Sequence, residues 1–122
     1  MIPQTLKSQF EKYDQTLKLE CDGFTRVLDY LLEKNNIQHE TYIGHVKWNN
    51  KQFEPHLWIF CNNIILDYRL QLWFGKFAPH GIFQIKKDNN IFTNEKINIV
   101  YTGEPISLKT SDVVFNILTE GL

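Results

Sequence analysis

The stretch that most constrains this chain runs from Pro55 to Arg69. Two apolar runs are joined there by Asn62 and Asn63, and asparagine tolerates the positive φ that a two-residue hairpin turn requires. Apolar residues fall on both faces of these runs, which indicates a sheet that is covered on both sides. The sequence therefore predicts an antiparallel hairpin at the centre of the fold.

The register of this hairpin brings one imidazole and one carboxylate to the same face. With the turn at residues 62–63, Trp58 pairs with Asp67 and His56 is diagonal to Asp67. Opposed residues share a face, as do residues two apart on one strand. Diagonal neighbours lie ~7–8 Å apart, which is within reach of these two side chains. A slip of one residue would put them on opposite faces, so their meeting depends on the register.

Apolar periodicity in the rest of the chain predicts N-terminal helices followed by the strands of an antiparallel sheet. Helical spacing recurs over residues 3–18 and 24–34. Alternation predicts strands over residues 38–48, 52–61, 64–68 and 97–102, and a second hairpin formed by residues 82–85 and 91–92. Residues 70–75 form a short helix or an irregular turn.

A last helix is expected near the C-terminal end of the sequence. Thr110 or Ser111 would cap it, because a hydroxyl can accept a hydrogen bond from the free amides of a first helical turn. Its apolar residues Val114, Ile117 and Leu118 are expected to face inward.

Cys21 lies three residues before Phe24, at the N-terminus of the second predicted helix and on the side that faces the core. A helix N-terminus favours a thiolate over a thiol. Acyl transfer by cysteine needs this thiolate, an imidazole to activate it and a third group to hold the imidazole. Taken alone, Cys21 is better explained as a small core residue and His56 as a structural histidine. The two together with Asp67, whose carboxylate needs a partner if it is buried, favour catalysis.

The order and local sequence of these residues resemble the transglutaminase-like, papain-like superfamily of cysteine enzymes. Cys21 opens a helix, Gly44 lies in a strand, and the sequences His-Leu-Trp from His56 and Leu-Asp-Tyr around Asp67 follow in the next two strands. The resemblance covers residues 19–69, and the superfamily includes transglutaminase-like cysteine proteinases and arylamine N-acetyltransferases. It implies an α+β fold with a transglutaminase-like core, in which N-terminal helices pack on an antiparallel β-sheet. One helix would carry the nucleophile Cys21, and the sheet would carry His56 as general base and acid and Asp67 as its orienting residue.

Three further residues are candidates for contact with a substrate: Trp48, Trp58 and His80. The indole of Trp48 could join the backbone N–H of Cys21 in stabilising an oxyanion. His80 lies in a Pro-His-Gly loop, where functional residues often concentrate, although a plain turn residue is the commoner case.

Two other histidines and an aromatic cluster have alternative explanations. His45 could compete with His56 for the catalytic role, whereas His39 is expected at the surface. Tyr68, Trp73 and Phe74 could line a substrate cleft, although a place in the core is the safer interpretation.

Composition limits the class of protein. The 122 residues, 43% hydrophobic and 22% charged, fit one domain spanning 1–122 with a sizeable core. A formal net charge of −1 with no basic run argues against a nucleic-acid partner. No segment resembles a membrane span or a secretory signal, which favours a cytoplasmic location. The two cysteines form neither a disulfide framework nor a zinc knuckle.

These observations predict a cysteine-dependent acyl-transfer enzyme that is a peptidase, an amidase or transglutaminase-like. Its substrate would be a peptide or another amide or ester, and the chemistry needs neither a metal nor an organic cofactor. The alternative is a catalytically inactive binding or interaction protein on the same fold. In that case the triad of Cys21, His56 and Asp67 would serve packing and hydrogen bonding.

Overall fold

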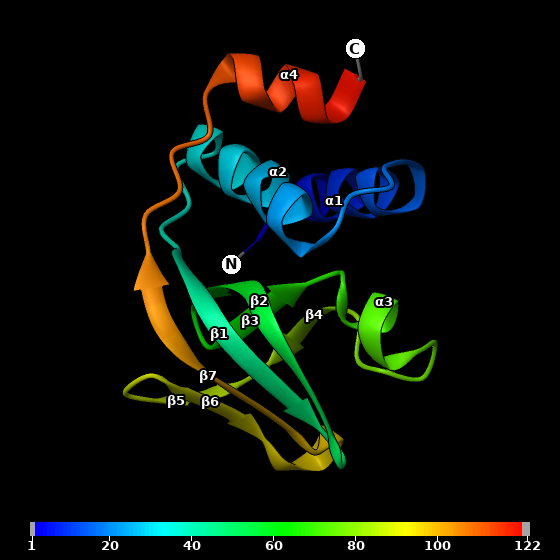
Figure 1. Cartoon of the computed structure of the whole chain (residues 1–122). Helices are drawn as coiled ribbons and strands as arrows, with labels where there is room; N and C mark the ends of the chain where they lie inside the picture. Colours follow the sequence, from blue (N-terminus) through cyan, green and yellow to red (C-terminus); the bar gives the residue numbers. More distant parts are fainter. Residues whose placement is uncertain (1, 121–122) are drawn as a thin grey trace.

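The computed structural model describes residues 2–120 and has a mixed α+β architecture, as the sequence predicts (Figure 1). Within this part of the chain, four α-helices accompany a seven-stranded antiparallel sheet. In chain order the elements are α1 (Gln4–Thr16), α2 (Cys21–Lys34), β1 (Glu40–Trp48), β2 (Lys51–Cys61), β3 (Ile64–Asp67), α3 (Leu70–Phe74), β4 (Gly81–Gln84), β5 (Lys86–Asp88), β6 (Ile91–Asn94), a 3₁₀ turn (Glu95–Ile97), β7 (Ile99–Ile106) and α4 (Asp112–Glu120).

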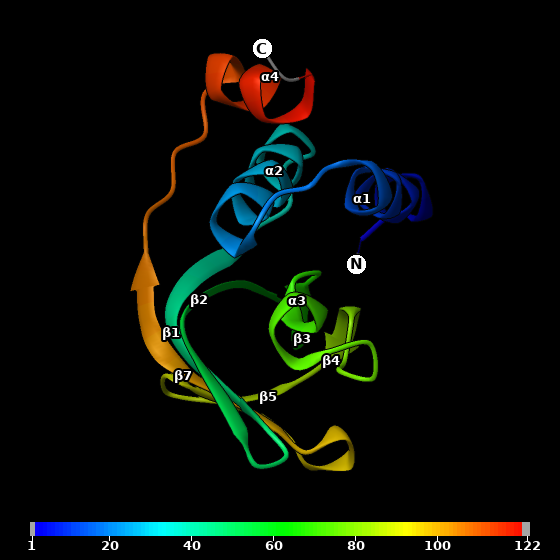
Figure 2. The same cartoon turned by 45° about the vertical axis from the view of Figure 1, so that its right-hand side comes forward.

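The sheet curls almost into a barrel. Its strand order is β4-β3-β2-β1-β7-β6-β5, so β4 and β5 lie at opposite ends of the order although Ile85 alone separates them in the chain. Figures 1 and 2 show the strands wrapping round to bring these ends together. The side-chain amide of Asn94 on β6 donates to the Gln84 carbonyl oxygen at the end of β4, at 2.8 Å. The chain therefore closes the sheet by passing directly from one edge to the other.

The central hairpin forms in the predicted register. Cys61 pairs with Ile64, and Phe60 pairs with Ile65, as predicted. Asn62 and Asn63 have φ values of 46° and 65°, so both turn residues are in the left-handed region. This is the geometry of a type I′ turn, whose twist matches that of the flanking strands. The asparagine pair thus sets which residues of β2 and β3 face each other.

The predicted second hairpin is wrong in its pairing. Residues 81–84 pair with β3 instead, and Lys86–Asp88 forms the short hairpin with β6. Asn89, with φ of 56°, supplies the tight turn that joins these two short strands. Turn chemistry alone could not reveal that residues 81–84 would extend the sheet beside β3.

Two facing glycines let β1 and β7 approach each other closely. Gly44 pairs with Gly103, and a Cβ atom added at Gly44 would lie 2.0 Å from the Thr102 carbonyl oxygen. A Cβ atom added at Gly103 would lie 2.3 Å from the Ile43 carbonyl oxygen. On its other side, β1 has a bulge against β2 just after Gly44. Bulges and glycines at such points increase the bending of a strand.

The sheet separates two apolar cores. The first lies under α1 and α2, where helix residues such as Phe10 and Leu28 pack on Ile59 of β2. The second is enclosed by the curled sheet and α3, and Phe83 of β4 reaches Tyr101 of β7 across it, with ring centroids 6.5 Å apart. Each face of the sheet therefore covers apolar side chains, as the two-sided hydrophobicity of β2 and β3 indicated.

Helix α4 lies on the side of α2 away from the sheet (Figure 1). Of its three residues predicted to face inward, Leu118 packs against the first core and Val114 is half-buried, but Ile117 is exposed. Ser111 caps α4, accepting a hydrogen bond from the Val114 amide at 3.1 Å. Phe115 stacks on Tyr30 of α2 with centroids 4.0 Å apart. The prediction for Ile117 is wrong because α4 packs on α2 through Phe115 and does not contact the sheet with the face that carries Ile117.

Buried Arg69, which follows β3, ties the sheet to the connection between α1 and α2. Its guanidinium donates to the carbonyl oxygens of Leu17 and Leu19 and, at 2.5 Å, to the Asp14 carboxylate. The same group lies 4.0 Å from the ring centroid of Phe24. An arginine can make all these contacts at once because its donors are arranged in a planar fork. Arg69 thereby fixes the segment that leads into α2.

Replacing this arginine should destabilise the protein strongly. We expect Arg69→Met to lower the free energy of unfolding by about 3 kcal/mol, because it leaves buried carbonyl oxygens and Asp14 without their cation. Urea unfolding followed by circular dichroism measures the loss. Arg26→Met is the matched control, since Arg26 forms only an exposed ion pair with Asp22 on the same helix, and it should cost less than about 1 kcal/mol. Equal losses in the two variants would contradict this role.

Candidate functional site

His56 and Asp67 meet inside the fold. His56 lies on β2 and Asp67 on β3, and the imidazole Nε2–H donates to the Asp67 Oδ2 at 2.7 Å. The two residues are 0% and 3% exposed. The proximity expected from the hairpin register is therefore present, and the contact is a direct hydrogen bond.

The Asp67 carboxylate has donors for both of its oxygens. The Tyr101 hydroxyl donates to Oδ2 at 2.8 Å, and the Arg69 backbone N–H donates to Oδ1 at 3.1 Å. Burial and the adjacent Asp67 charge raise the pKa of Tyr101 well above its ordinary value, so its hydroxyl keeps its proton. Three donors, one from His56 itself, make it possible for a carboxylate to remain charged away from water.

The second ring nitrogen of His56, Nδ1, is available to a further group, and Cys21 is the residue that also affects the ring. Within residues 2–120, Nδ1 is buried and has no hydrogen-bond partner. Burial alone would lower the pKa of His56, but the charge and hydrogen bond of Asp67, together with smaller contributions from Cys21, raise it to about 10. The sulfur is thus close enough to influence the ring, and Nε2 is already occupied. His56 is consequently an imidazolium at neutral pH.

Cys21 is the first residue of α2 and borders a cavity. Its side chain is largely covered, with the residue 8% exposed, and the cavity beside it has a volume of ≈ 450 Å³. No side chain caps the N-terminus of α2. The amides of its first turn therefore have no side-chain acceptor, and such free amides favour negative charge nearby.

The walls of this cavity are mostly apolar, with charged residues from the start of α2 at its rim. Phe53 of β2 stacks on Trp73 of α3, with ring centroids 4.1 Å apart, and the pair forms one aromatic wall. The remaining lining residues are Ile43, Pro55, Leu57, Ile106 and Leu108, with Glu20, Asp22 and Arg26 on the charged side. We name this the Cys21 cavity.

The three residues predicted to contact a substrate lie elsewhere. Trp58 is fully buried inside the curled sheet, and Trp48 packs on Phe74 with centroids 6.0 Å apart. His80 hydrogen-bonds to Asp14 at 2.8 Å. None of the three borders the Cys21 cavity. The aromatic residue that does border it from the predicted cluster is Trp73, which the sequence could not distinguish from a core residue.

The other two histidines also have defined places. The expectation that His39 lies at the surface is wrong: its side chain is 5% exposed and hydrogen-bonds to Asp29 at 2.7 Å. His45 is half-buried on β1 beside the bulge. Within the described part of the chain no carboxylate forms an ion pair with His45, so His56 alone has both a carboxylate and a cysteine beside it.

Tyr101 is the residue of this site that sequence reasoning missed. A strand over residues 97–102 was predicted, but its place in the sheet depends on how β7 pairs with β1, which no local pattern reveals. Val46 pairs with Tyr101, and this pairing directs the hydroxyl into the curled sheet towards Asp67.

Comparison with known proteins found no matching family model, no similar curated protein and no similar solved structure. Among the described residues, no helix combines the length and apolar character needed to cross a membrane. The site is therefore interpreted from its own geometry.

The raised pKa of His56 makes protein stability depend on pH. A group whose pKa is higher in the folded state stabilises that state fully below its unfolded value, here 6.5, and the effect is lost as pH rises through its folded value, here about 10. In a Cys21→Ser protein, where no thiol beside the ring can titrate, we expect the free energy of unfolding to fall as pH rises above 6.5, by at most about 1.4 kcal/mol per pH unit for one proton. Urea unfolding at several pH values measures the slope.

The variant His56→Gln should flatten this slope, because an amide can still donate to Asp67 but does not titrate. In the same Cys21→Ser background, His45→Gln, on the neighbouring strand, should keep the slope of the parent. If the slope is unchanged in His56→Gln, His56 is not the group that titrates.

Proposed function

We propose that this protein is a cysteine-dependent acyl-transfer enzyme with a transglutaminase-like arrangement of Cys21, His56 and Asp67. The proposal rests mainly on how the two ring nitrogens of His56 are bonded. One of these nitrogens is held by a fully bonded, buried carboxylate and the other has no hydrogen-bond partner, while Cys21, at the edge of a cavity, contributes to raising the pKa of the ring. A purely structural histidine would be expected to use both nitrogens.

The charges in this group suit a thiolate nucleophile. The pKa of about 10 keeps His56 protonated at neutral pH. A positive charge beside a sulfur, and a helix N-terminus beneath it, both favour the thiolate over the thiol. Cys21 and His56 would therefore work as an ion pair, and no base would need to be recruited before attack.

The chemistry follows from these positions. The Cys21 thiolate attacks the carbonyl carbon of an amide or ester, forming a C–S bond and moving the carbonyl electron pair onto oxygen. Uncapped amides in the first turn of α2 supply donors for that oxyanion. When the intermediate collapses, the bond to the leaving amine or alcohol breaks, and His56 Nδ1–H gives its proton to it.

A second half-reaction restores the enzyme. Water or an amine attacks the thioester, and His56 accepts the proton of the attacking molecule as the C–S bond breaks and the thiolate re-forms. Asp67 holds the ring through Nε2 in both halves. Tyr101 and Arg69 act as positioning residues because they donate to Asp67 and touch no reacting atom.

The cavity indicates the acyl groups that would fit. The stacked pair of Phe53 and Trp73 lies on one wall and Leu57 is also apolar, so an aliphatic or aromatic group next to the scissile carbonyl would be accommodated. Polar atoms of the leaving group would face the charged rim formed by Asp22 and Arg26.

Alkylation of Cys21 by iodoacetamide tests whether the thiolate exists. We expect rapid alkylation that persists well below pH 7, because thiolate is the reacting species, and a rate at pH 6 that falls at least ~10-fold in His56→Gln. Peptide mass spectrometry locates the label, and the rate is followed from pH 5 to 9.

The chain provides its own control in Cys61. That sulfur is buried, donates to the Gln38 carbonyl oxygen at 3.2 Å, and has a pKa raised by burial, so it should stay unlabelled in the folded protein. Cys61→Ser should leave the pH profile unchanged. A profile for Cys21 that rises only above pH 8, as for an ordinary thiol, would favour the inactive binding protein instead.

A further inference from the structure

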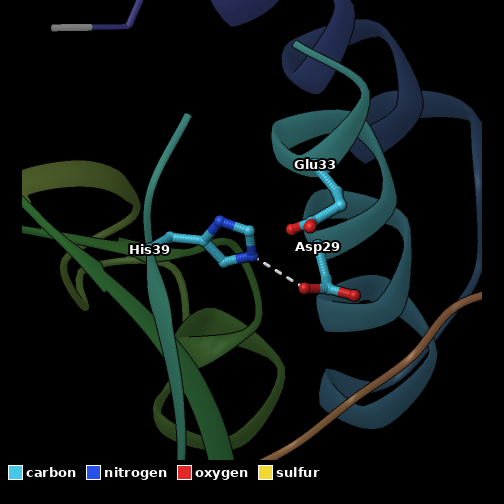
Figure 3. A group of neighbouring side chains, drawn as sticks. All are labelled: Asp29, Glu33 and His39. Atoms are coloured by element: carbon cyan, nitrogen blue, oxygen red, sulfur yellow. Dashed lines mark hydrogen bonds and ion pairs between the residues drawn. The ribbon is translucent and has the colours of Figure 1, made fainter. Parts of the chain in front are cut away.

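A second group of polar side chains lies on α2, away from the Cys21 cavity. Asp29 and Glu33 are one turn apart on the same face of the helix, and His39 approaches them from the segment that leads into β1 (Figure 3). One ligand atom from each residue lies within 4.8 Å of the other two. The side chains of His39 and Asp29 are 5% and 10% exposed, so two of the three are held in the protein interior.

The orientation of His39 creates a conflict between acceptors. Its Nδ1 lies 2.8 Å from the Ile37 carbonyl oxygen, and a carbonyl oxygen can only accept, so Nδ1 carries a hydrogen. In a neutral ring, Nε2 then presents a lone pair, and it faces the Asp29 Oδ1 at 2.7 Å. Two acceptors stay at this distance only with a second proton on the ring, and a metal ion that binds both would hold them slightly farther apart.

The surroundings match those of metal-bound histidines. Such histidines usually donate their other ring N–H to a backbone carbonyl or a carboxylate, as His39 does to Ile37. The second oxygen of Asp29 accepts a hydrogen bond from the Thr110 hydroxyl at 3.3 Å, which orients the carboxylate from outside. Glu33 is exposed and points to the same place, where its carboxylate can move to meet an ion.

We propose that Asp29, Glu33 and His39 bind a divalent transition-metal ion of the Zn²⁺ class. One imidazole and two carboxylates are ligands that suit Zn²⁺, whereas Mg²⁺ and Ca²⁺ prefer oxygen alone. Ligand atoms around tetrahedral Zn²⁺ lie roughly 3.3 Å apart, so the Asp29 carboxylate would move back by about half an ångström. A cavity of ≈ 710 Å³ borders all three residues and leaves room for a solvent ligand.

The ion would join three parts of the fold. It would link α2 to the start of β1 and, through Thr110, to the connection between β7 and α4. Binding would therefore stabilise the position of α2, whose first residue is Cys21. The site is independent of the proposed acyl-transfer chemistry, which was expected to need no metal, and was not among the sites predicted from the sequence.

Zinc titration of the metal-free protein tests the proposal. The protein carries Cys21→Ser so that Zn²⁺ cannot bind the active-site thiol, and affinity is measured by competition with a chelating dye. We expect saturable 1:1 binding, with Mg²⁺ failing to compete. Loss of a ligand should weaken binding at least ~10-fold in Glu33→Gln and ~100-fold in His39→Gln. Co²⁺ in place of Zn²⁺ should give the visible absorption of a low-symmetry, four- or five-coordinate site.

Glu40→Gln is the matched control, because Glu40 is a neighbouring exposed carboxylate on the rim of the same cavity. Its affinity for Zn²⁺ should equal that of the parent. Because Glu33 is exposed, Glu33→Gln should fold normally even if His39→Gln does not. Absence of saturable Zn²⁺ binding, or equal weakening by Glu33→Gln and Glu40→Gln, would overturn the proposal and leave a proton between His39 and Asp29.

Discussion

The hydrogen bond between His56 and Asp67 is the interaction on which the rest of the site depends. It crosses from β2 to β3 in a region closed to water, where neither an imidazolium nor a carboxylate could remain charged alone. A slip of one residue between the two strands would separate the pair. The left-handed turn at Asn62 and Asn63, which sets this register, is therefore as important to the site as the charged residues.

Arg69 links this pair to the cysteine. Its backbone N–H binds Asp67, and its guanidinium binds the connection that leads into α2, so one residue relates the carboxylate to the helix that begins at Cys21. Tyr101 completes the arrangement from the other side of the curled sheet. His56 is thus fixed through one nitrogen and has no hydrogen-bond partner on the other, and Cys21 lies at the edge of the cavity. This rigidity suits catalysis by preorganised charge.

Sequence reasoning succeeded where the determining contacts are local. The hairpin register follows from two asparagines and the period of a strand, and helical periodicity predicts α2 over residues 24–34, although the helix begins three residues earlier, at Cys21. Sequence reasoning failed where the position of a side chain depends on how the sheet closes. Tyr101 reaches Asp67 only because β7 pairs with β1, and Phe53 meets Trp73 only because α3 folds back against β2. Trp58 points into the enclosed core rather than into a cleft for the same reason. Such placements depend on contacts between residues that are distant in the chain.

The formation of an acyl-thioester on Cys21 is the most direct measure of whether this arrangement is catalytic. The protein is mixed with an activated acyl ester such as p-nitrophenyl acetate, quenched in acid, and analysed by peptide mass spectrometry. We expect a transient acyl group on Cys21 that is absent in His56→Gln and unaffected in Cys61→Ser. Acylation elsewhere in the chain, or none faster than that of the unfolded protein, would contradict it.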